Sequence, residues 1–180
     1  MMVLVTGGSG SGKSLLAEQI SFKLKTEPFY YLATMKIWDE ECKIRVERHK
    51  KQRDGKEFQT IEAPDNLSEI AMNLEFHGTA LLDCIGNLTA NEQFEVDAIN
   101  TVKNIVDGVN EVYKRLDNLI IVTNEVFSDI IPEDKDMQKY IQHIGKINCE
   151  LAKMSDIVIE SYGGIPIIWK GERLYNEIMA

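Results

Sequence analysis

Residues Gly7–Ser14, GGSGSGKS, have the types and the spacing needed to bind phosphate groups. They match the pattern G-x-x-x-x-G-K-[ST], and they stand between an apolar run, VLVT, and a helical pattern, SLLAEQI. Glycines let the backbone curl so that its N–H groups point at phosphate oxygens, and the helix that follows adds its positive dipole end. The alternative is a flexible Gly/Ser turn, but the strand before and the helix after favour a nucleoside triphosphate site. Its predicted members are Gly7, Gly8, Ser9, Gly10, Ser11, Gly12, Lys13 and Ser14.

Two of these side chains have predicted roles of their own. Lys13 would neutralise the β- and γ-phosphates, and the Ser14 hydroxyl would ligate Mg²⁺. Such a site also needs an acid at the end of a neighbouring strand. Asp83 closes the apolar run ALLDC and is the predicted second Mg²⁺ ligand, while Glu125 in LIIVTNE is its rival. For either acid, the alternative is a solvated residue that only ends a strand.

A second candidate is the basic stretch around His49. Six of the chain's 20 basic residues lie between Lys43 and Arg53, although the formal net charge is −9. A neutral imidazole is a good nucleophile toward phosphorus, and the cations around it would hold phosphate groups. Helical spacing places Arg45 and Arg53 near His49 on one face. The alternative is the solvated face of an ordinary amphipathic helix.

Short apolar runs that alternate with helical patterns must position these residues. The predicted strands are Val3–Thr6, Phe29–Thr34, Ala80–Ile85, Leu119–Thr123, Asp156–Ile159 and Ile165–Trp169. The predicted helices are Ser14–Lys25, Asp39–Arg53, one from about Asn66, Glu95–Leu116 and Met137–Lys153. This order predicts an α/β fold, a P-loop NTPase-like three-layer sandwich with a mainly parallel sheet. Ligands of such sheets bind at the carboxyl ends of the strands.

Composition limits the class of protein. A chain of 180 residues with 44% hydrophobic content suits one domain, 1–180. Its apolar runs are too short for a signal peptide or a membrane span, so we expect a cytoplasmic protein. The net negative charge argues against a nucleic-acid partner. Three cysteines without a CxxC pair predict neither disulfides nor a zinc site, and Cys149 is expected in the core. His77 and His143 are expected to be structural or on the surface.

These motifs together resemble the bifunctional adenosylcobinamide kinase/adenosylcobinamide-phosphate guanylyltransferase family of cobalamin biosynthesis. The resemblance is carried by VLVTGGSGSGKS, YYLATM, RVERHKKQR, TIEAP, LLDCIGNLTAN, VTNEVFSDIIP and KINCELAKMSDIVIESYGGIPI. The VTNEV run and Asn148 in KINCELA are more specific than the phosphate loop, because other NTPases do not need them. The chain departs from the family pattern at Gly10, where arginine is usual, and at Phe127, where glycine is usual. The tail GERLYNEIMA also extends beyond the pattern.

The resemblance implies a two-step enzyme. ATP or GTP would phosphorylate the aminopropanol hydroxyl of adenosylcobinamide, and GMP would then pass from GTP to that phosphate through a GMP-histidine intermediate at His49. It implies a corrinoid substrate, homotrimers and further nucleotide contacts. Those contacts fall on Thr34, Met35, Lys36, Lys50, Lys51, Gln52, Arg53, Glu62 and Asp83. Two alternatives stay open: a P-loop kinase of another small acceptor, and a nucleotide-binding regulatory module.

Overall fold

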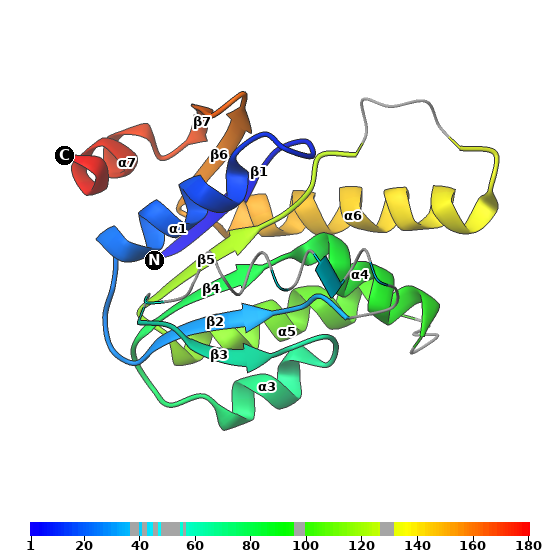
Figure 1. Cartoon of the computed structure of the whole chain (residues 1–180), viewed down its shortest axis with the longest axis horizontal. Helices are drawn as coiled ribbons and strands as arrows, with labels where there is room; N and C mark the ends of the chain where they lie inside the picture. The colour runs from blue at the N-terminus through cyan, green and yellow to red at the C-terminus, as the bar shows by residue number, and fades with distance from the viewer. Residues whose placement is uncertain are drawn as a thin grey trace.

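The computed structural model is built on one seven-stranded sheet with helices on both faces (Figure 1). It describes residues 1–36, 40, 43–44, 47, 55, 57–95, 100–126 and 132–180. The strands are β1 (Met2–Thr6), β2 (Phe29–Ala33), β3 (Gln59–Glu62), β4 (Thr79–Asp83), β5 (Asn118–Val122), β6 (Ile157–Tyr162) and β7 (Ile165–Lys170). The helices are α1 (Lys13–Lys23), α3 (Leu67–Asn73), α4 (Ile85–Phe94), α5 (Thr101–Arg115), α6 (Lys135–Met154) and α7 (Glu172–Met179).

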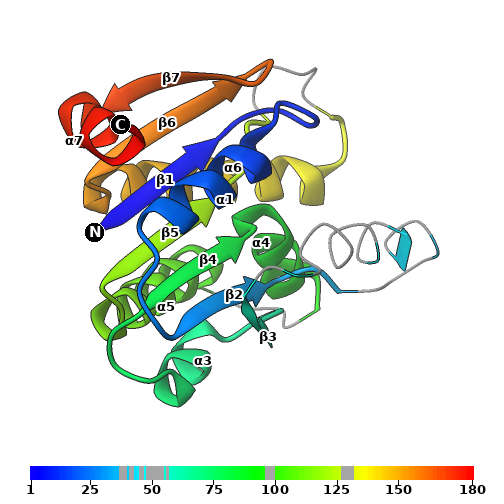
Figure 2. The ribbon, with the colours of Figure 1, turned by 60° about the vertical axis from the view of Figure 1, so that its left-hand side comes forward.

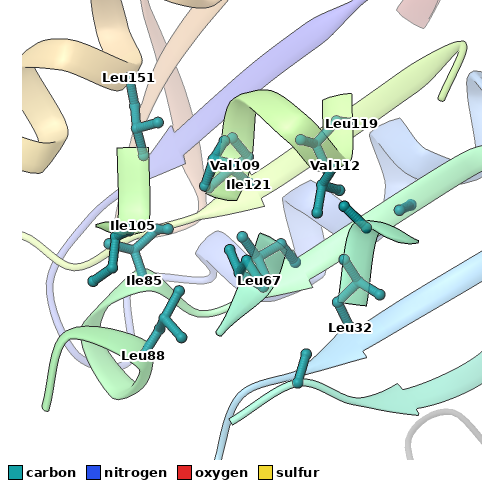
Figure 3. Close-up of a cluster of buried hydrophobic side chains, with 14 of the residues drawn as sticks. Leu32, Leu67, Ile85, Leu88, Ile105, Val109, Val112, Leu119, Ile121 and Leu151 are labelled. Carbon is teal, nitrogen blue, oxygen red and sulfur yellow. The ribbon is translucent and has the colours of Figure 1, made fainter. Parts of the chain in front are cut away.

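The strand order is β3-β2-β4-β5-β1-β6-β7, and only β7 runs antiparallel to its neighbour. The central strands are apolar throughout because both faces of the sheet are covered. Along β1, Leu4 faces the cluster built with α3, α4, α5 and α6, whereas Val3 and Val5 face α1. Figure 3 shows the larger cluster, in which Ile105, Val109 and Val112 of α5 pack on the strands. The predicted α/β fold with a mainly parallel sheet and three layers is therefore confirmed.

All six predicted strands form, with ends shifted by a few residues. Three elements were not predicted: β3, α4 and α7. The strand β3 is short and largely exposed, so its sequence QTIE lacks an apolar signal. The helix α4 was not predicted, because its buried face includes polar side chains and so lacks a clear apolar pattern. In the described part of the chain, the helix expected from Glu95 begins at Thr101, and the C-terminal tail forms α7.

The structure bears on two further expectations, the position of Cys149 and the presence of a membrane-spanning helix. Cys149 is exposed on α6, so its assignment to the core was wrong; Ile144, Ile147 and Leu151 supply the buried face of that helix. None of the described helices combines the length and the apolar content that a membrane crossing requires.

The strand register aligns the predicted site residues along one edge of the sheet. Glu62 pairs with Ala33, Ala33 with Asp83, and Asp83 with Val122, which in turn pairs with Val5. The phosphate loop, which follows β1, and the loop that follows β2 and contains Met35 therefore begin at the same edge of the sheet. With strands about 4.8 Å apart, Asp83 lies about 10 Å from β1 and Glu62 about 19 Å from it.

Candidate active site

The phosphate loop joins β1 to α1, as the sequence predicts (Figure 1). Gly12 is the N-cap residue of α1 and has a φ of +88°, a conformation that favours glycine. A Cβ atom at Gly12 would also lie 3.3 Å from Gly164 Cα. The ammonium of Lys13 turns back over the loop and donates to Gly8 O at 3.1 Å. The loop thus presents a helix N-terminus and one lysine at the same place, which is the arrangement that binds phosphate.

The end of β6 and the turn that follows it support this loop (Figure 2). Ser161 Oγ donates to Ser11 O at 2.7 Å, and Gly164 N donates to the same oxygen at 2.9 Å. Ser11 Oγ is buried and has no hydrogen-bond partner among the described residues. Sequence patterns did not assign Ser161 or Gly164 to the site, because the contact joins segments 150 residues apart.

We expect Ser161→Ala to weaken nucleotide binding. It removes one of the two hydrogen bonds to Ser11 O, and a net loss of about 1 kcal/mol corresponds to about a fivefold rise in Kd. The measurement is calorimetric titration with ATP and Mg²⁺. Ser155→Ala is the matched control, because Ser155 Oγ makes a buried bond of the same kind to Leu151 O, at 2.8 Å, away from the loop. Equal Kd values for the two variants would contradict the supporting role of Ser161.

Asp83, the predicted Mg²⁺ ligand, is half-buried at the end of β4. Tyr31 Oη donates to Asp83 Oδ2 at 2.8 Å and orients the carboxylate. The rival acid, Glu125, belongs to the loop after β5, and its backbone N–H donates to Gly7 O at 3.1 Å. Both acids therefore lie at the edge that carries the phosphate loop. The part of the chain that the structure describes contains no group of three or more metal-binding acidic, histidine or cysteine side chains.

Ser14 and Asp83, the two predicted ligands, carry donors of the type that fits Mg²⁺. Both offer oxygen, the ligand that this ion prefers, and Mg²⁺ in nucleotide sites takes only one or two protein ligands besides phosphates and water. A cluster of three carboxylates is therefore not required.

The Cys84 thiol follows Asp83 and is buried. Burial, with the Asp83 carboxylate adding to it, raises the pKa of Cys84 to about 12. The thiol is therefore protonated at neutral pH, and Cys84 is not a nucleophile there.

Some of the predicted nucleotide-contact residues near β2 and β3 already bond to other residues of the protein. Thr34 is fully buried; its Oγ1 donates to Cys84 O at 2.9 Å and accepts from Cys84 N at 2.6 Å. Lys36 is half-buried and pairs with Glu95 at 2.7 Å and Asp65 at 2.9 Å, contacts that raise its pKa. Met35 is half-buried, and Glu62 is exposed at the end of β3. Of these four, Glu62 has the side chain most accessible to a ligand.

Asn148 ties α6 to the loop after β5. Thr123 Oγ1 donates to Asn148 Oδ1 at 2.6 Å, and Asn148 Nδ2 donates to Asn124 O at 3.3 Å. The VTNEV run and the KINCELA run, which carry much of the family resemblance, are thus in direct contact. Their contact fixes the strand end beside β1.

The basic stretch cannot be placed in this site from the structure. His49, Lys50, Lys51, Gln52 and Arg53 lie outside the described residues, as does Phe127.

The family model described as cobinamide kinase / cobinamide phosphate guanyltransferase (CobU) matches residues 3–168. The chain belongs to this family. It is 28% identical to the bifunctional adenosylcobalamin biosynthesis protein CobU of Escherichia coli, over 93% of this chain and 98% of that protein. It is 27% identical to the bifunctional adenosylcobalamin biosynthesis protein CobP of Pseudomonas aeruginosa, over 97% of this chain and 100% of that protein. The CobU match includes the phosphate loop, Asp83 and the basic stretch.

Among solved structures, flagellar accessory protein FlaH from Methanocaldococcus jannaschii aligns with a TM-score of 0.46 and 15% identity. The alignment covers 94% of this chain and 77% of FlaH.

Proposed function

We propose that the chain is a bifunctional enzyme of cobalamin biosynthesis, which phosphorylates adenosylcobinamide and then transfers GMP to the product. The observation that carries this proposal is the CobU family match from residue 3 to residue 168, which spans the phosphate loop and the His49 stretch together. The names of the relatives from Escherichia coli and Pseudomonas aeruginosa support the pathway.

In the kinase step, the acceptor hydroxyl attacks the γ-phosphorus of ATP or GTP, the bond to the β-phosphate oxygen breaks with release of ADP or GDP, and the hydroxyl proton passes to solvent. Lys13 offsets the negative charge on the transferring group, and the backbone N–H groups of Gly7–Ser14 hold the phosphates in line. Mg²⁺, held by Ser14 and Asp83, would supply further charge stabilisation on the phosphate oxygens. The protein needs no nucleophile of its own in this step.

In the guanylyl step, an imidazole nitrogen of His49 attacks the α-phosphorus of GTP, and pyrophosphate leaves. An oxygen of the acceptor phosphate then attacks the same phosphorus, and His49 is released as GMP joins the acceptor. The cations around His49, among them Lys50, Lys51 and Arg53, offset the charge of the triphosphate and the leaving pyrophosphate. Glu62 would accept from the N–H donors of a guanine base, and its exposure at the end of β3 supports this role.

The same proposal includes a homotrimeric, cytoplasmic enzyme made of a single domain, as the family resemblance implies. Analytical ultracentrifugation of the full chain tests the oligomeric state.

The direct test of the function is turnover. Purified protein is incubated with adenosylcobinamide, ATP, GTP and Mg²⁺, and the corrinoid products are separated and weighed by mass spectrometry. We expect adenosylcobinamide phosphate first and adenosylcobinamide-GDP after it. A protein that hydrolyses or binds nucleotide but leaves the corrinoid unchanged would contradict the proposal.

Asp83→Asn tests the metal assignment. We expect the phosphoryl transfer rate to fall by about 10²-fold at low Mg²⁺ and to recover in part as Mg²⁺ is raised, because the amide binds the ion less tightly than the carboxylate. Rates are measured across a Mg²⁺ titration. Tyr31→Phe is the companion variant; it removes the hydrogen bond to Asp83 Oδ2 but keeps the charge, so a smaller loss is expected. A defect in Asp83→Asn that is equal at all Mg²⁺ concentrations would overturn the metal role.

A further inference from the structure

The strand β5 lies between β1, which leads into the phosphate loop, and β4, which ends at Asp83 (Figure 2). The loop after β5 contacts both neighbours. On one side, the Glu125 backbone N–H donates to Gly7 O at 3.1 Å. On the other side, the loop packs against Gly86 of α4, three residues after Asp83. The loop after β5 therefore lies between the phosphate loop and the acid predicted to ligate Mg²⁺.

The side chain of Asn124 makes the contact with α4. A Cβ atom at Gly86 would lie 2.8 Å from Asn124 Nδ2 and 3.2 Å from Asn124 Cγ, so the amide occupies the space that glycine leaves open. Gly86 is buried in the first turn of α4, and its carbonyl accepts from Tyr140 Oη of α6 at 3.2 Å. The Asn124 amide therefore rests against a piece of helix that a second helix holds in place.

The backbone of Asn124 is fixed as well, whereas its amide keeps its donors. Asn148 Nδ2 donates to Asn124 O at 3.3 Å, and the neighbouring Thr123 Oγ1 donates to Asn148 Oδ1 at 2.6 Å. Asn124 is half-buried, and its side-chain amide has no hydrogen-bond partner among the residues that the structure describes. An asparagine amide carries two N–H donors, so this side chain can bind an acceptor group of a ligand.

We propose that the Asn124 amide donates a hydrogen bond to the γ-phosphate of the nucleoside triphosphate in the kinase step, an inference that rests on the proposed function. In the proposed site, Ser14 and Asp83 share the ion that bridges the β- and γ-phosphates, so the γ-phosphate lies on the β4 side of the phosphate loop. Neighbouring strands are about 4.8 Å apart, and β5 is the strand between β1 and β4. The γ-phosphate then lies over the end of β5, where Asn124 is the second residue after the strand.

A contact with the γ-phosphate distinguishes a triphosphate from a diphosphate. The phosphate loop binds the phosphates that both nucleotides share, whereas the Asn124 amide would contact only the one that is transferred. During transfer, negative charge spreads over the oxygens of this group, and a donor already fixed toward them stabilises the transition state. Asn124 should therefore add to the affinity for ATP and not to the affinity for ADP. A purely structural role would lower both affinities by the same factor.

The test compares Asn124→Ala with Asn110→Ala by calorimetric titration with Mg²⁺ and either ADP or the β,γ-imido analogue of ATP, which cannot transfer its phosphate. We expect Asn124→Ala to raise the Kd of the analogue by about tenfold and that of ADP by less than about twofold. Asn110 is the matched control, because it is half-buried like Asn124 but lies on α5, which ends at the opposite edge of the sheet. Its variant should keep the wild-type ratio of the two Kd values. A wild-type ratio in Asn124→Ala would overturn the contact.

Gly86→Ala reaches the same amide from the side of α4. Its methyl group would displace the Asn124 amide, so we expect the Kd ratio to shift in the same direction by at least about threefold. In the Asn124→Ala background it should have little further effect, because the atoms that the methyl would meet at 2.8 and 3.2 Å are gone. Gly108→Ala is the control: its Cβ would lie 2.7 Å from Leu67 Cβ, which is similar crowding between α5 and α3. Full additivity of Gly86→Ala and Asn124→Ala would overturn the contact.

The titrations also keep this inference apart from the proposed function, because they contain no corrinoid. If the wild type leaves adenosylcobinamide unchanged in the turnover assay, the proposed function fails, and the Kd ratios still decide whether Asn124 contacts the γ-phosphate. A wild type that binds neither nucleotide would overturn both.

Discussion

Lys13→Ala is expected to lower kcat/KM for phosphoryl transfer by at least about 10²-fold and to weaken triphosphate binding. The Lys13 ammonium lies over the phosphate loop, within hydrogen-bonding distance of Gly8 O. After its removal, the phosphate loop itself offers the nucleotide only backbone N–H groups and the helix dipole, which supply fractional charges. The measurement is the initial rate of γ-phosphate transfer, with nucleotide Kd determined in parallel.

Lys23→Ala is the control for this variant. Lys23 lies in the last turn of the same helix, α1, and is exposed, so its loss removes the same charge far from the loop. We expect near wild-type rates from it. Near wild-type phosphoryl transfer by Lys13→Ala would remove the basis for placing the nucleotide at residues 7–14.

His49→Ala is expected to abolish guanylyl transfer and to leave the kinase rate within about threefold of wild type. GMP transfer needs the imidazole to attack the α-phosphorus and to leave afterwards. In the proposed mechanism, γ-phosphoryl transfer runs directly to the acceptor hydroxyl and depends on Lys13 and Ser14. Both reactions are followed from the same incubation by separating the two corrinoid products.

His77→Ala provides the matched histidine control, because the His77 side chain is 80% exposed and contacts Asp117. Both residues precede their strands, so they lie at the end of the sheet opposite to the phosphate loop. This variant should retain both activities. If His49→Ala lost both activities equally, the basic stretch would have a shared nucleotide-binding role in place of a nucleophilic one.

Local sequence signals predicted the parts of this site that depend on local structure. The phosphate loop is a continuous pattern, and the strand runs place Asp83 and Thr34 at strand ends because each follows an apolar stretch. The register across the sheet then brings those ends into one row without further information from the sequence.

The contacts that hold this row together were not predictable in the same way. Ser161 reaches Ser11 across 150 residues, and Asn91 reaches Thr34 across 57. Each contact depends on how two elements pack in the folded protein, and the sequence of neither element indicates its partner. The helix α4 illustrates the reason: its buried Asn91, Glu92 and Gln93 read as a polar surface until their partners are known. Cys149 shows the reverse case, an apolar position on a helix that faces outward.

Covalent labelling of the wild-type protein tests the central claim most directly. The purified full chain is incubated with Mg²⁺ and either α-³²P-GTP or γ-³²P-GTP, denatured, and digested for peptide mapping. We expect label from the α position only, on the peptide that contains His49, stable in base and lost in acid as expected of a phosphorus–nitrogen bond. Absence of α label, label from the γ position, or label on a peptide without His49 would contradict it.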